Sequence, residues 1–198
     1  MDAISLTTFV DFVSKSGTPK LTVVRDWKYR DKYDPQTDYW KQLREAIIAV
    51  HEKGHGFGRL DAVAANSSDK KRENYGALAK AYKKWVGKQG MPWFKPPKLE
   101  WTCNGVSVII NPELGLEIDG AKHLIKLYFR EEKLPANRAV LALQAMYEAL
   151  ATKAKPGLVV ALLDIRKGKL HTSTGSVKEH SDQLFAEAAY WTAIYPKL

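Results

Sequence analysis

The chain has 198 residues, of which 45% are apolar and 27% are charged, and its 31 Lys and Arg against 22 Asp and Glu give a net charge of +9. This composition excludes a disordered or low-complexity chain, and the length supports one sizeable core, so we expect a single domain over residues 1–198. The longest apolar run has six residues and the amino terminus lacks a secretory pattern, so we expect a cytoplasmic protein with no membrane partner.

Residues 1–98 are predicted to be mainly helical. Apolar residues at helical spacing predict three helices, over 5–15, from Asp38 to Gly54 or Gly58, and over 69–88. Residues 21–25 fit a short strand, and residues 64–68 have the composition of a loop. Proline and glycine around residues 90–97 end this helical part.

Residues 99–198 are predicted to be richer in strands. Asn104-Gly105 and Asp119-Gly120 have the composition of two-residue hairpin turns, in which both positions need a positive φ, so residues 99–130 are expected to form an antiparallel meander. Three further elements are predicted: helices over 136–153 and 181–195, and a strand over 158–166 that pairs with 169–172. The predicted fold class is α+β, a mostly antiparallel sheet covered by helices with a helical amino-terminal half.

Most of the excess positive charge lies in one segment. Residues 67–98 contain two acidic side chains and nine basic ones: Lys70, Lys71, Arg72, Lys80, Lys83, Lys84, Lys88, Lys95 and Lys98. Lysines beside aromatic rings suit phosphate backbones and unstacked bases. Tyr75, Tyr82 and Trp85 nevertheless recur at helical spacing, which favours a buried stripe with the lysines on its solvated face.

Residues 51–61 read HEKGHGFGRLD and fit the pattern H-E-x-x-H-x-x-G-x-x-D. Two histidines four residues apart on a helix can share one zinc ion, and the glutamate between them can take a proton from metal-bound water. The segment resembles the zinc-binding signature of the metzincin peptidases. That resemblance implies His51, His55 and Asp61 as zinc ligands and Glu52 as the general base. The alternative is that His51 lies at the edge of the core and the glycines only end the helix.

The order of elements over residues 99–166, three strands, a helix and a strand, resembles the core of restriction-type and RecB-like nucleases. Such sites combine a carboxylate on one strand with an acid-x-Lys triplet on the next, because alternate strand residues face one side. The candidates are Glu113 and Glu117 with Lys126. Leu124 occupies the acidic position of the triplet, so we expect Lys126 to be an ordinary solvent-facing residue and the two glutamates to be surface charges.

The leading hypothesis from the sequence is a protein that binds nucleic acid or another polyanion, such as an acidic protein, through the basic segment 70–98. One alternative is a zinc-dependent hydrolase that uses residues 51–61, and zinc is expected as a cofactor only under this alternative. A second alternative is a protein-interaction module without catalysis. Whether the protein is an enzyme, and its oligomeric state, stay open at this point.

Overall fold

The computed structural model describes residues 2–30, 38–132, 134–151, 157–173 and 175–198. The elements of its first half are β1 (Ile4–Ser5), α1 (Leu6–Val13), α2 (Thr18–Lys28), α3 (Lys41–Glu52), α4 (Gly58–Ala65) and α5 (Asp69–Val86). Those of its second half are β2 (Leu99–Cys103), β3 (Val106–Ile110), β4 (Leu114–Ile118), β5 (Ala121–Tyr128), α6 (Ala136–Ala151), β6 (Leu158–Asp164), β7 (Lys169–Ser173), α7 (Lys178–Ile194) and a closing 3-10 turn (Tyr195–Lys197). The α+β class and the helical amino-terminal half are therefore confirmed.

The strands form two mixed sheets and not one meander. One sheet has the order β1-β3-β2 and the other has the order β4-β5-β6-β7. Each contains one parallel pair, β1 with β3 and β5 with β6, so the mostly antiparallel description is only roughly right. Both predicted hairpins form, and their turn residues Asn104, Gly105, Asp119 and Gly120 all have positive φ.

The predicted meander over 99–130 is wrong at the connection between β3 and β4. Strand β3 is the central strand of its sheet, with β1 on one edge and β2 on the other, so no edge is left for β4. Pro112 in the connection also lacks the N–H that a ladder would need. The chain therefore leaves the first sheet at Ile110 and starts the second at Leu114.

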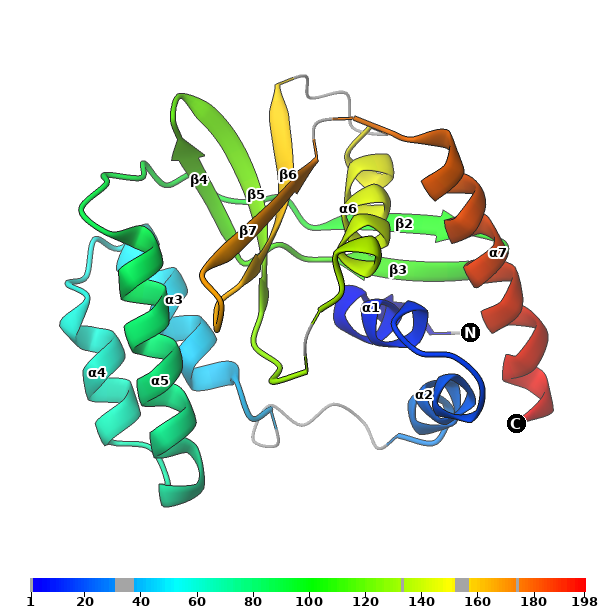
Figure 1. Cartoon of the computed structure of the whole chain (residues 1–198), viewed down its shortest axis with the longest axis horizontal. Coiled ribbons are helices and arrows are strands. Elements are labelled where there is room, and N and C mark those ends of the chain that lie inside the picture. The colour runs from blue at the N-terminus through cyan, green and yellow to red at the C-terminus, as the bar shows by residue number, and fades with distance from the viewer. Residues whose placement is uncertain (1, 31–37, 133, 152–156, 174) are drawn as a thin grey trace.

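The four-stranded sheet separates two hydrophobic cores (Figure 1). Helices α3, α4 and α5 cover one face, while α1, α6, α7 and the three-stranded sheet lie on the other. Alternate residues of β5 pack into the two cores. Leu124 lies on the α6 side, and Ile125 and Leu127 lie on the α5 side. This alternation places Lys126 on the same face as Leu124, toward α1.

Two local predictions in the first half were wrong. Residues 21–25 lie inside α2 and not in a strand, because Pro19 occupies the first turn of a helix, where its missing N–H costs nothing. Residues 64–68 were expected to be loop, but α4 extends to Ala65. No helix in the described ranges combines the length and apolarity required to cross a bilayer.

Candidate anion-binding cavity

A cavity of about 730 Å³ opens between α1, the start of α3 and the end of β5. This volume is in the usual range of small-molecule sites. Its charged lining consists of six basic side chains (Lys15, Arg30, Arg44, Lys98, Lys126 and Arg130) and four carboxylates (Asp11, Asp38, Glu113 and Glu132). Positive groups thus exceed negative ones by two among the described residues of the lining.

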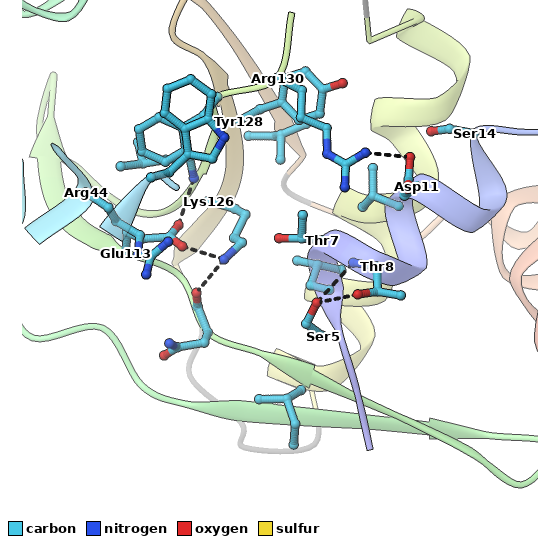
Figure 2. Close-up of a pocket in the computed structure, with 18 of the residues that line it drawn as sticks. Ser5, Thr7, Thr8, Asp11, Ser14, Arg44, Glu113, Lys126, Tyr128 and Arg130 are labelled. Carbon is cyan, nitrogen blue, oxygen red and sulfur yellow. Dashed lines mark hydrogen bonds and ion pairs between the residues drawn. The ribbon is translucent and has the colours of Figure 1, made fainter. Parts of the chain in front are cut away.

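The Lys126–Glu113 ion pair forms one wall of the cavity (Figure 2). The Lys126 Nζ atom lies 2.5 Å from Glu113 Oε1 and 3.2 Å from the carbonyl oxygen of Asn111. The other carboxylate oxygen of Glu113 accepts the backbone N–H of Leu127 at 2.8 Å. The side chain of Lys126 is 13% exposed and that of Glu113 is 7% exposed, so the expectation of surface charges is wrong for both.

The register of the β4–β5 hairpin explains this pair. The paired register ends with Leu114 opposite Ile125, and Glu113 and Lys126 are the next residues along the two chain segments. The backbone N–H of Glu113 donates to the carbonyl of Ile125 at 3.0 Å, which holds Glu113 against β5 just before β4 begins. Glu117 lies opposite Lys122 at the other end of the hairpin and is absent from the cavity lining, so the structure separates the two candidate glutamates.

The opposite wall is the hydroxyl-rich first turn of α1. Ser5 caps the helix by accepting the Thr8 backbone N–H at 3.0 Å, and the two side-chain hydroxyls are 2.9 Å apart. Thr7 is exposed, and Figure 2 shows it across the cavity from Lys126. Hydroxyl groups and an ammonium group thus face each other over the hollow.

Two further carboxylates form ion pairs with basic groups of the rim. Asp11 of α1 accepts Arg130 at 3.0 Å and Lys15 at 3.5 Å. Asp38 accepts Arg44 at 2.7 Å, just before α3 begins. Each carboxylate fixes the position of a cation that faces the cavity. Each also lowers the net positive charge of the cavity.

Aromatic side chains complete the lining. Trp40 stacks on Phe129 with ring centroids 5.5 Å apart and an angle of 15° between the rings. Tyr128 also lines the cavity, and burial raises the pKa of its hydroxyl, so at neutral pH it is protonated and donates to the Glu132 carbonyl at 3.0 Å. These rings give the wall a rigid apolar part.

The predicted basic segment contributes to this cavity only at its end. Lys98 lines the cavity, whereas Lys71 is outside the lining and has its ammonium 5.3 Å from the ring of Tyr39, which in turn contacts Trp40 of the lining. Five others of the segment have exposed side chains: Lys70, Lys80, Lys84, Lys88 and Lys95.

Two members of the segment are neutralised by the protein itself. Lys83 binds both carboxylate oxygens of Asp61, at 2.6 and 2.8 Å, and Arg72 pairs with Asp69 at 2.9 Å. The aromatic residues of the segment serve the core, as the helical spacing indicated, and Tyr75 and Tyr82 are fully buried.

The structure does not bring the predicted zinc ligands together. Helix α3 ends at Glu52, before His55, so the two histidines are not one turn apart on a helix. His51 Nε2 lies 2.7 Å from the Tyr82 hydroxyl, and burial lowers the pKa of this histidine. Asp61 is bound to Lys83, while Glu52 and His55 are exposed. Across the described ranges, no three His, Cys, Asp or Glu side chains gather closely enough to hold a metal ion.

A nuclease-type core was expected to have three strands before the helix, but of the described strands only β4 and β5 precede α6 in the four-stranded sheet, and β3 belongs to the other sheet. Lys126 and Glu113 form an ion pair, but Leu124 is fully buried in the core. The sequence did not point to Asp11, Thr7, Arg44 or Arg130, because these side chains come from segments far apart in the chain. A basic and hydroxyl-rich hollow of this kind is suited to hold an anion.

No family model matches this chain, and neither does any curated protein.

Proposed function

We propose that this protein binds nucleic acid and that a phosphate group of a single strand enters the cavity beside Lys126. The single observation that carries the proposal is the geometry of this lysine. An ammonium group has three N–H donors, and in the described part of the chain Glu113 and Asn111 take two of them. The third is left for a ligand in the cavity, where the Thr7 hydroxyl lies opposite.

The charge and size of the cavity support a phosphate-bearing ligand. The lining has two more cations than carboxylates, and neither Arg30 nor Lys98 has an ion pair in the described ranges. Basic side chains that neutralise phosphates supply most of the affinity for nucleic acid by releasing counterions. A volume of about 730 Å³ accommodates a nucleotide and excludes a duplex.

The exposed lysines of residues 70–98 support nucleic acid over a small isolated anion. Lys71 is connected to the cavity wall through Tyr39 and Trp40, and Lys98 lines the cavity itself. A strand that leaves the cavity would therefore pass cationic side chains on α5 and before β2. Such a surface raises the association rate of a polyanion in a salt-dependent way.

The test is a titration with a single-stranded oligonucleotide at several salt concentrations, using two matched double variants. Lys98→Gln with Arg30→Gln removes two cations from the cavity lining. Lys80→Gln with Lys84→Gln removes two cations from the exposed face of α5. Both variants lower the net charge equally. We expect the cavity variant to weaken binding about tenfold and to reduce the salt slope by about 1 to 2, and the α5 variant to change affinity less.

Two results would contradict the proposal. Absence of binding to DNA and RNA at low salt would remove nucleic acid as the ligand. An equal or larger loss of affinity in the α5 variant would show that the strand binds to the outer face of that helix and not in the cavity.

A further inference from the structure

A second hollow of about 480 Å³ adjoins the cavity on the side of α2. In the part of the chain that the structure describes, the two hollows share six lining residues: Thr8, Asp11, Lys15, Trp27, Arg30 and Arg130. The second hollow adds Thr22 and Asp26 from the exposed face of α2. The shared residues make the two hollows neighbouring parts of one surface.

The boundary between the hollows is a polar wall built by α1 and the end of β5. Asp11 forms ion pairs with Arg130 at 3.0 Å and with Lys15 at 3.5 Å. All three side chains line both hollows. Beside them, the Arg30 guanidinium lies 3.1 Å above the ring of Trp27, and both groups also border both hollows. A ligand that spans both hollows therefore passes Lys15, Arg30 and Arg130, which border both of them.

We infer that the site has two subsites and binds a strand of at least two nucleotides, one unit in the cavity and the next in the hollow beside α2. This inference rests on the proposed function and specifies the form of its ligand. Among the described residues, three cations, Lys15, Arg30 and Arg130, border the second hollow, against two carboxylates, so it too favours a phosphate. The Arg30 guanidinium, exposed and stacked on Trp27, offers a planar face to a base.

The length dependence of binding tests this inference. The probes are thymidine 5′-monophosphate and a single-stranded oligothymidylate of about six nucleotides. Once the first unit is bound, the second binds as part of the same molecule, so we expect the oligonucleotide to bind at least about tenfold more tightly than the mononucleotide.

A charge placed in the second hollow gives an independent readout. Thr22 is exposed on α2, and Thr22→Glu adds a carboxylate to the second hollow only. The matched control is Thr172→Glu on β7, where the threonine is also exposed and lines neither hollow. We expect Thr22→Glu to weaken oligonucleotide binding about tenfold and to leave mononucleotide binding within about twofold, while the control changes neither.

The outcomes separate the two proposals. If both probes bind equally well and Thr22→Glu affects them alike, the second subsite is refuted and the cavity proposal stands. If the oligonucleotide gains affinity but Thr22→Glu and Thr172→Glu behave alike, the second contact lies elsewhere and this inference is overturned. If neither probe binds at low salt, the proposed function and the second subsite are both refuted.

Discussion

The Glu113 carboxylate has two roles, because it holds Lys126 in place and also lowers the positive charge of the cavity. Its two oxygens bind different donors, the Lys126 ammonium and the backbone N–H of Leu127. Glutamine in its place keeps only one acceptor oxygen, so its NH₂ group must face one of these donors. The buried lysine would then lose its counter-charge.

Glu113→Gln should therefore destabilise the fold and strengthen anion binding at the same time. We expect the free energy of unfolding to fall by about 2 kcal/mol, because a buried donor is left without an acceptor. We also expect oligonucleotide affinity to rise by about fivefold, since the Lys126 ammonium is no longer neutralised. Denaturant unfolding and a binding titration on the folded variant measure the two effects.

Glu117→Gln is the matched control for this change. Glu117 is on the same hairpin but half-buried, opposite Lys122 and outside the cavity. We expect both stability and affinity to stay near those of the wild type. Weaker oligonucleotide binding by a folded Glu113→Gln variant would show that the carboxylate itself is needed and that Lys126 is not the anion-binding group.

Strand β4 is hydrogen-bonded on its outer edge to residues 92–94, which do not belong to a strand. The Phe94 N–H donates to the Gly115 carbonyl at 2.9 Å, and the Glu117 N–H donates to the Pro92 carbonyl at 2.9 Å. A Cβ atom at Gly115 would overlap the carbonyl oxygen of Phe94 and press against its ring. The glycine is thus required by a close backbone approach.

Gly115→Ala should lower the free energy of unfolding by more than about 2 kcal/mol, because the overlap involves backbone that cannot move aside cheaply. Gly76→Ala is the comparison, since Gly76 lies inside α5 with open space around its Cβ position. That change should raise stability by about 0.5–1 kcal/mol through helix propensity. Thermal or denaturant unfolding measures both, and a neutral Gly115→Ala would contradict this packing of residues 92–94 on β4.

The elements that the sequence predicted well are those with a strong local signal. The Asn-Gly and Asp-Gly turns set both hairpins, and Glu113 and Lys126, which form the ion pair, directly follow the last residue pair of the second one. The β-branched residues of 21–25 favoured a strand. These residues are helical instead, because α2 packs on α1 and a proline lies at its start. The break between the sheets had only Pro112 as a local signal, because it depends mainly on the pairing of β3 with the distant β1.

For the whole molecule, the cavity could not be predicted because its walls come from distant parts of the chain. Lys126 and Arg130 lie in the second half of the chain and Lys98 lies at its middle, while Thr7 and Asp11 lie near the amino terminus. The position of α1 beside β5 follows from the parallel pairing of β1 with β3 and from the core that α1 shares with α6. Composition indicated a basic surface, but only the fold could show which cations face a hollow.

The Glu148 carboxylate connects α6 with α7 and with the three-stranded sheet. The Glu148 carboxylate of α6 accepts the Trp101 indole N–H at 2.6 Å, the Ser181 hydroxyl at 2.7 Å and the Gln144 amide at 2.9 Å. Burial by itself would raise the pKa of Glu148, but these three hydrogen bonds stabilise the charged form and hold the pKa below its ordinary value. The network joins β2, α6 and α7 in one unit.

This network should make the fold sensitive to acid in a defined direction. The pKa of Glu148 is lower in the folded chain than its ordinary value of 4.5, so its stabilisation is complete above that pH and is lost as the pH falls through the folded value. We expect Glu148→Gln to cost about 1 kcal/mol at pH 7, because the carboxylate is partly exposed. The difference in unfolding free energy between variant and wild type should shrink below about pH 4.5, as followed by Trp fluorescence in denaturant. A difference that is constant with pH would mean that the hydrogen bonds do not depend on the charge of Glu148.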